Sequence, residues 1–134
     1  SAFGNNFVKT MMRLMKTKES IQVVCDQRGT PTYAGDLARA ILGILTAPQY
    51  IPGIYHYSNE GETTWYEFAL EIKKITGSLC TVLPVKSSGY PTAAKRPAYS
   101  LLNKSKIKRD YKLSVPDWKS SLAICVNTLL KSGV

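Results

Sequence analysis

The alternation of amphipathic helical segments with short β-branched runs is the feature that most constrains how this chain can fold. Apolar residues recur at three- and four-residue spacing between Phe7 and Met15, and Asn5 or Asn6 stands where a helix N-cap is expected. The run Ile21–Cys25 is short and β-branched, which is typical of a strand. Because this order recurs along the chain, the pattern predicts an α/β fold with several helices and a few short strands.

The middle of the sequence predicts two further helices with a strand between them. Thr30–Pro31 places a capping hydroxyl before a proline at the first helical position, and an apolar helical stripe follows. Gly53–Ser58 has the composition of a strand. Thr64 and Glu67 match the S/T-x-x-E capping box, which opens a helix that Gly77 closes.

The last third of the chain predicts an edge strand, a long loop and two helices. Thr81–Val85 is expected at a sheet edge because Pro84 has no N–H to donate. Residues 86–97 form a loop of a length that is usually functional or mobile. A short basic helix capped by Asn103 follows, and the final helix covers Pro116–Lys131. No repeat or linker divides the sequence, so residues 1–134 are predicted to form one domain.

The charge of the chain favours anionic partners. It has 18 Lys and Arg against 9 Asp and Glu, a net charge of +9. Such a balance suits nucleic acid, anionic lipid or a phosphorylated small molecule. The only dense basic cluster is Lys104–Arg109, which is read as the solvated face of a short helix, with a nucleic-acid patch as the alternative.

Cysteine usage and hydropathy narrow the classes of protein to which this chain can belong. Cys25, Cys80 and Cys125 are odd in number and widely spaced, with a single histidine in the chain, which argues against a zinc site or a disulfide framework. No apolar run reaches the roughly 20 residues of a membrane span, and no secretory signal is recognisable. We therefore expect a cytoplasmic protein with no bound metal and no membrane partner.

The glycine-rich motifs of nucleotide enzymes are missing. A dinucleotide-binding fold opens with a strand, a G-x-G-x-x-G turn and a helix whose N-terminus holds the pyrophosphate. This sequence has neither that motif nor a P-loop, and its first predicted helix begins within a few residues of Ser1. We therefore expect a fragment of a longer protein.

An ordered series of short motifs gives the chain a specific family resemblance. The most distinctive are D-Q-x-G-T-P-T and Y-P-T-x-A-x-R-P-x-x-S. In order, the segments are Asn6–Val8, Asp26–Thr32, Asp36–Ala38, Gly53–His56, Trp65–Ala69, Tyr90–Leu102 and Pro116–Trp118. Together they resemble, nearly end to end, the C-terminal half of dTDP-4-dehydrorhamnose reductases, which are extended short-chain dehydrogenases.

The resemblance implies a reaction. It also implies that the catalytic residues for this reaction are not in the present chain. These reductases use NADPH or NADH to reduce the 4-keto group of a dTDP-linked deoxysugar in the last step of dTDP-L-rhamnose synthesis. The family's catalytic pair is a tyrosine with a lysine four residues later, and none of the eight tyrosines here has that lysine. We therefore expect the pair and the cofactor site upstream of Ser1, and the isolated chain to be a substrate-binding lobe without activity.

Five residues are candidates for substrate binding. Arg96 can grip a diphosphate with paired charge-assisted hydrogen bonds, a role that the resemblance supports; otherwise it is a surface arginine. Asn6 at a helix start can face a phosphate or sugar, or serve only as a cap. Gln27 and Thr30 follow a predicted strand end and can contact a pyrimidine or ribose, or only form a turn. Tyr90 can stack on a base, or pack within its loop.

The leading hypothesis is therefore the sugar-nucleotide-binding domain of a dTDP-4-dehydrorhamnose reductase. Its partners are a dTDP-sugar and the missing Rossmann half, with a homodimer left open and no nucleic acid expected. Two alternatives stay open. One is another nucleotide-sugar epimerase or dehydratase, and the other is a non-catalytic regulatory or interaction domain of the same fold.

Overall fold

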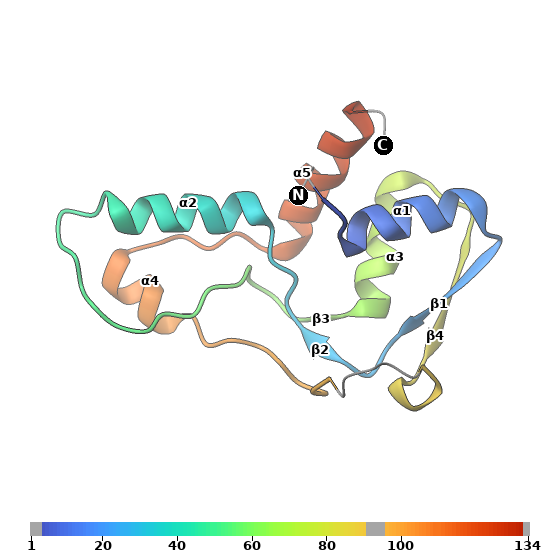
Figure 1. The fold of residues 1–134 in the computed structure, drawn as a ribbon, viewed down its shortest axis with the longest axis horizontal. Helices are drawn as coiled ribbons and strands as arrows, with labels where there is room; N and C mark the ends of the chain where they lie inside the picture. The colour runs from blue at the N-terminus through green and yellow to red at the C-terminus, as the bar shows by residue number, and fades with distance from the viewer. Residues whose placement is uncertain (1–3, 91–95, 133–134) are drawn as a thin grey trace.

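The structure is a computed structural model that describes residues 4–90 and 96–132, so residues 91–95 of the predicted loop lie outside it. Helices flank two short pairs of strands, and the molecule is elongated (Figure 1). The elements are α1 Phe7–Thr17, β1 Ser20–Val24, β2 Arg28–Gly29, α2 Ala34–Leu45, β3 Thr63–Thr64, α3 Trp65–Thr76, β4 Thr81–Val85, the 3-10 turn η1 Ser87–Gly89, α4 Ser105–Tyr111 and α5 Trp118–Lys131.

The strands β1 and β4 form a two-stranded parallel sheet. Their register runs from Ser20 opposite Thr81 to Val24 opposite Val85. Both strands occur where the β-branched runs predicted them. Among the residues that the structure describes, the strand that contains Pro84 pairs with β1 alone. The expectation that Pro84 marks an edge strand is therefore confirmed.

The hydrophobic core lies between this sheet and helices α1, α3 and α5. Phe68 of α3 stacks on Phe7 of α1 with ring centroids 5.5 Å apart, and meets Trp118 of α5 edge-on at 5.6 Å. Trp118 is 5% exposed, and Val126 and Leu129 are fully enclosed. The apolar spacing of the first and last helices therefore does identify core-facing residues.

Local capping signals set the ends of α1 and α3 as expected. The Oδ1 of Asn6 accepts a hydrogen bond from the Lys9 N–H at 3.1 Å, which makes Asn6 the N-cap of α1. The Thr64 hydroxyl accepts from the Glu67 N–H at 3.1 Å while the Glu67 carboxylate accepts from the Thr64 N–H at 2.8 Å. Gly77 ends α3 with φ of +66°, a left-handed conformation that glycine adopts without steric cost.

The predicted start of α2 is wrong. The helix begins at Ala34 with Tyr33 as its N-cap, so Pro31 does not occupy the first helical position. The Thr30 hydroxyl instead donates a hydrogen bond of 2.6 Å to the Gly61 carbonyl, in a segment 31 residues away. A long-range partner has replaced the local capping contact that the Thr-Pro pair suggested.

The predicted strand Gly53–Ser58 is also wrong, since this segment is irregular in the structure. Side chains of α4 form hydrogen bonds with two of its polar groups. Lys106 Nζ donates to the Ile54 carbonyl at 3.1 Å, and the Tyr55 hydroxyl donates to Asp110 at 3.0 Å. Within the described ranges no strand pairs with it, and a strand composition without a pairing partner does not produce a strand.

A buried polar hub joins α2 to α5. Asn59 has no exposed surface, and its Nδ2 donates to Asp36 Oδ2 at 2.6 Å and to Ser121 Oγ at 2.9 Å. Its Oδ1 accepts from the Tyr33 N–H at 2.9 Å. Through these hydrogen bonds, Asn59 in the segment before β3 connects the start of α2 with the first turn of α5.

The basic cluster before and within α4 is not simply a solvated face. Lys104, 8% exposed, donates to the Asn59 carbonyl at 2.9 Å and pairs with Glu60, which Lys108 also contacts. The hydrogen bond from Lys108 is the main reason that the pKa of Glu60 is lowered. Asn103 accepts from the Ser105 N–H at 2.9 Å, although Lys104 occupies the N-cap position. Two lysines of this basic cluster therefore form ion pairs within the fold.

Candidate functional site

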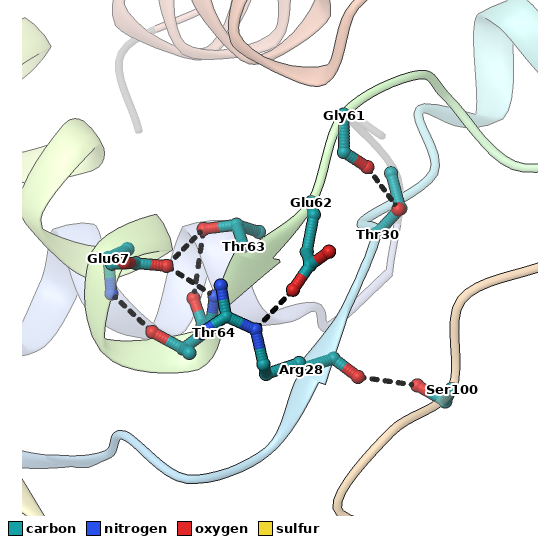
Figure 2. A network of polar contacts seen from close by, with 8 residues as sticks. All are labelled: Arg28, Thr30, Gly61, Glu62, Thr63, Thr64, Glu67 and Ser100. Carbon is teal, nitrogen blue, oxygen red and sulfur yellow. Dashed lines mark hydrogen bonds and ion pairs between the residues drawn. The ribbon is translucent and has the colours of Figure 1, made fainter.

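Three distant segments meet around the short strand β2. Arg28 and Gly29 pair antiparallel with Thr64 and Thr63 of β3. On its other side, the Arg28 N–H donates to the Ala98 carbonyl at 2.8 Å and its carbonyl accepts from the Ser100 N–H at 2.9 Å. Figure 2 shows β2 between β3 and the strand-like segment that carries Ser100. The chain that follows Arg96 is thus held against the turn that follows β1.

The guanidinium of Arg28 pairs with one carboxylate and lies near a second. Its Nε pairs with the Glu62 carboxylate, and this hydrogen bond is the main reason that the pKa of Arg28 is raised (Figure 2). Glu67 lies near enough to raise it further, while its own pKa is lowered chiefly by the hydrogen bond from the Thr64 backbone. The capping box of α3 and this ion pair therefore lie side by side at one wall of the site (Figure 2).

A cavity of about 290 Å³ lies at this junction. Three of the predicted site residues, Gln27, Thr30 and Arg96, line it together. Trp65 and Phe68 supply an apolar wall from the start of α3. The sequence separates Arg96 from Gln27 by almost seventy positions, so only the pairing of β2 with residues 98–100 brings them to one cavity.

A larger groove of about 880 Å³ adjoins this cavity. Gln27, Trp65 and Arg96 line both spaces, and Tyr90 lines the groove. The Gln27 amide donates to the Ser87 hydroxyl at 2.9 Å. Ser87 in turn donates its N–H to both oxygens of Asp26 at 3.0 Å, and its hydrogen bonds lower the pKa of that carboxyl. The first turn of the 86–97 loop is therefore fixed to the end of β1.

Asn6 lies apart from the arginine. It lines a third cavity, of about 210 Å³, which shares Trp65, Phe68 and Pro31 with the first. Arg96 does not line that space. Asn6 is thus separated from the other four candidate residues by the aromatic wall.

The two arginines at the site differ in their ion pairing. Within the described ranges Arg28 is paired with a carboxylate, whereas Arg96 is exposed and forms no ion pair. Sequence reasoning missed Arg28, although its position after a strand end, beside Gln27, was a usable signal. It also missed Trp65 as a cavity wall, because an aromatic residue on an apolar helix face is expected in a core.

The described part of the chain was searched for metal-binding groups and for membrane-spanning helices. No group of three or more His, Cys, Asp or Glu side chains is placed to hold a metal ion. None of the helices described is long and apolar enough to cross a membrane.

The arrangement of helices and short strands occurs in part of a larger solved enzyme. A UDP-glucose 4-epimerase from Thermotoga maritima covers all of this chain with a TM-score of 0.77 at 17% identity, and the match spans 42% of the epimerase. At that identity the likeness concerns the fold. It confirms the predicted α/β class.

Closer relatives identify the family. Residues 1–131 match the family model described as the RmlD substrate binding domain, and the chain belongs to this family. A dTDP-4-dehydrorhamnose reductase structure from Clostridium acetobutylicum has a TM-score of 0.89 and 40% identity over 95% of this chain and 45% of that one. A reductase from Bacillus anthracis, solved in complex with NADP, has a TM-score of 0.82 and 40% identity over 90% of this chain and 42% of that one.

Curated sequences agree with the solved structures. The dTDP-4-dehydrorhamnose reductase of Escherichia coli is 40% identical over 136 residues, which cover 94% of this chain and 45% of the enzyme. The chain therefore spans less than half the length of these relatives. The predicted resemblance to the substrate-binding part of this reductase family is confirmed.

Proposed function

We propose that this chain is the sugar-nucleotide-binding domain of a dTDP-4-dehydrorhamnose reductase. The full-length enzyme would carry out the NAD(P)H-dependent reduction of dTDP-4-dehydro-L-rhamnose to dTDP-L-rhamnose. One observation carries the proposal: in a member of this family, Gln27, Thr30 and Arg96 line one cavity, although they come from separate parts of the sequence. Among the described residues, Arg96 has no ion-pair partner.

The cation of Arg96 is assigned to the diphosphate of the substrate. A guanidinium offers two parallel N–H donors to phosphate oxygens, which a lysine cannot do. Arg28, in contrast, already has Glu62 as its counter-ion. Arg96 is therefore the better of the two arginines for binding an anion.

Gln27 and Thr30 are assigned to the nucleoside. The Gln27 amide N–H₂ faces Ser87, which leaves its carbonyl oxygen to accept an N–H from the pyrimidine edge. The Thr30 hydroxyl donates to Gly61, which leaves its lone pairs to accept from a sugar hydroxyl. Each residue thus has one group held by the fold and another group for the ligand.

Tyr90 and Asn6 are assigned more peripheral roles. Tyr90 borders the larger groove, where its ring can stack on the base. Asn6 borders the neighbouring cavity behind Trp65, so we assign to it the far end of the ligand rather than the diphosphate.

The residues of this chain do not fit the nicotinamide cofactor. The sequence has no G-x-G-x-x-G turn to approach a pyrophosphate and no tyrosine followed by lysine at the fourth position. We therefore derive no hydride or proton step here, and we predict that the 134-residue chain is inactive alone. The cofactor site and the catalytic pair are assigned to the part of the relatives' length that this chain does not span. We further propose a cytoplasmic location, and leave a homodimer open.

Calorimetric titration of the chain with dTDP, UDP and NADPH tests the proposal. We expect saturable binding of dTDP, weaker binding of UDP and no binding of NADPH. Arg96→Ala should weaken dTDP binding, whereas Arg13→Ala, which removes an equal charge from the exposed side of α1, should not. A preference for UDP would favour the epimerase or dehydratase alternative. Absence of any nucleotide binding would contradict the proposal and favour the regulatory alternative.

A further inference from the structure

The charges around the cavity beside β2 differ from the charge balance of the chain as a whole. The sequence has 18 basic and 9 acidic residues, and a site built only to attract anions would leave its arginines unpaired. Arg28 and Arg96 line the same cavity. Yet Glu62 pairs with Arg28, and Glu67 is near enough to raise the pKa of Arg28 further. A strongly basic chain thus places two carboxylates at the site proposed to bind a diphosphate.

The strand pairing explains why Glu62 meets Arg28. Arg28 lies opposite Thr64 in the antiparallel β2–β3 register, and Glu62 precedes Thr64 by two residues. Side chains two residues apart in a strand point to the same face, so Glu62 is a diagonal neighbour of Arg28. The Thr30 hydroxyl donates to the Gly61 carbonyl at 2.6 Å, which holds the chain just before Glu62 against the chain just after β2 (Figure 2). The ion pair is therefore set by the same strands that form a wall of the cavity.

The ion pair with Glu62 changes what the cavity offers to a ligand. An ion pair has no net charge, so Arg28 attracts an anion less while Glu62 lies beside it. Within the described ranges Arg96 forms no ion pair and keeps its full charge. Coulomb attraction is proportional to the charge of the ligand, so a weaker positive potential reduces the binding of the more anionic ligand most. Charge placed against a competitor in this way is a common source of specificity.

Sugar nucleotides and free nucleotides differ in charge at the diphosphate. The diphosphate of a dTDP-sugar is esterified at both ends and carries two negative charges. The terminal phosphate of dTDP is free and loses a second proton with a pKa of about 6, so dTDP carries about one more negative charge at neutral pH. We propose that Glu62, through its ion pair with Arg28, determines specificity by lowering the affinity for free nucleotides relative to sugar nucleotides. This inference rests on the proposed function, because it takes the diphosphate to bind at this cavity.

A double-mutant cycle tests the role of Glu62. The four proteins are the 134-residue chain, its Glu62→Gln and Arg28→Gln variants, and the variant with both substitutions. Calorimetric titration of each protein with dTDP and with dTDP-glucose gives two dissociation constants, and their ratio removes any change in affinity that both ligands share. Exposed ion pairs contribute little to stability, so all four proteins are expected to fold.

The two single variants should shift this ratio in opposite directions. Glu62→Gln leaves Arg28 without its counter-ion and should strengthen the binding of dTDP more than that of dTDP-glucose. For one unit charge at a separation on the order of 10 Å, the ratio should change by about 2- to 16-fold, as the effective dielectric constant falls from about 80 to about 20. Arg28→Gln leaves Glu62 unpaired and should weaken dTDP binding more. The double variant has the same net charge as the wild type, so its ratio should return to the wild-type value.

Glu71→Gln is the matched control. Glu71 pairs with Lys74 farther along α3 and lines neither the cavity nor the adjoining groove, so its substitution should leave the ratio unchanged. A ratio that Glu62→Gln does not change, or that the double variant does not restore, would overturn the inference, because Glu62 would then act only by holding β2 to β3.

The same titrations keep the two proposals apart. Binding of both ligands with one ratio in all four proteins retains the proposed function and removes the charge selection assigned to Glu62. Absence of binding of either ligand by any of the four contradicts the proposed function, and this inference with it.

Discussion

Replacing Asn59 by alanine should strongly destabilise the fold. Asn59 is fully buried, and its Nδ2 donates to Asp36 at 2.6 Å, to Ser121 at 2.9 Å and to the Pro116 carbonyl at 3.1 Å. Its Oδ1 accepts from the Tyr33 N–H at 2.9 Å. Asn59→Ala removes all four contacts at once and leaves a buried carboxylate short of a donor.

The size of the expected loss in stability follows from the hydrogen-bond partners of Asn59. A buried hydrogen bond to a carboxylate contributes about 1.5–3 kcal/mol and a neutral one about 1 kcal/mol, with a further cost for a donor left unsatisfied. Asp36 keeps its hydrogen bond from Ser121 and its ion pair with Arg39, which limits the loss. We therefore expect the free energy of unfolding to fall by about 3–5 kcal/mol, out of the roughly 5–15 kcal/mol of a typical domain.

Urea unfolding followed by tryptophan fluorescence measures this loss, because Trp118 lies in the core. With a slope of about 1–3 kcal/mol per molar urea, the midpoint should fall by at least about 1 M. Asn127→Ala makes the same chemical change at an exposed position of α5 and should alter stability by less than about 0.5 kcal/mol. A loss below about 1 kcal/mol for Asn59→Ala would show that the hub does not hold α2 to α5.

Three further predictions concern helix ends. Thr64→Ala removes the capping hydroxyl of α3 and should lower the free energy of unfolding by about 1 kcal/mol in the same urea assay; no loss would contradict the capping box. The pKa of Glu67 is lowered by that cap, so its stabilisation is present above its unfolded pKa of about 4.3 and is lost as the pH falls further. Melting temperatures of the wild type and Glu67→Gln, measured from pH 7 to pH 3, should therefore converge at the acid end, and a constant difference would exclude the linkage. Lys112 ends α4 with φ of +53°, a conformation that costs a residue with a side chain about 1 kcal/mol, so Lys112→Gly should raise the melting temperature rather than lower it.

The features predicted correctly from the sequence depend on nearby residues. The Asn6 cap, the Thr64–Glu67 box and the end of α3 at Gly77 are each decided within one helical turn. The edge position of β4 follows from the missing N–H of Pro84 alone. Such signals act whatever the rest of the chain does, so a single sequence is enough to find them.

The features predicted wrongly or missed depend on distant partners. Thr30 would cap a helix if its hydroxyl were not bonded to Gly61, and Gly53–Ser58 would be a strand if another strand lay beside it. The burial of Lys104 requires Glu60 and the carbonyl of Asn59, more than forty residues earlier. Neither spacing nor propensity contains this information.

The candidate site combines residues chosen from sequence with contacts that only the fold creates. Residue chemistry and the family resemblance singled out Gln27, Thr30 and Arg96, and the structure then places all three around one cavity. Asn6 could not be separated from them by sequence, since the aromatic wall formed by Trp65 and Phe68 exists only after α3 packs against α1. The pairing of Arg28 with Glu62, 34 residues apart, could not be foreseen for the same reason.

The cavity beside β2 is proposed to bind the nucleotide part of a dTDP-sugar, and amide chemical shifts map such binding most directly. A titration of the isotope-labelled 134-residue chain with dTDP should move the Gln27, Gly29, Thr30 and Arg96 amides most, along one saturable curve. The amides of α4, at the opposite end of the molecule from β1 and β4, should stay in place (Figure 1). Saturable shifts that centre on α4 instead would show that the basic helix, rather than the cavity, binds the nucleotide.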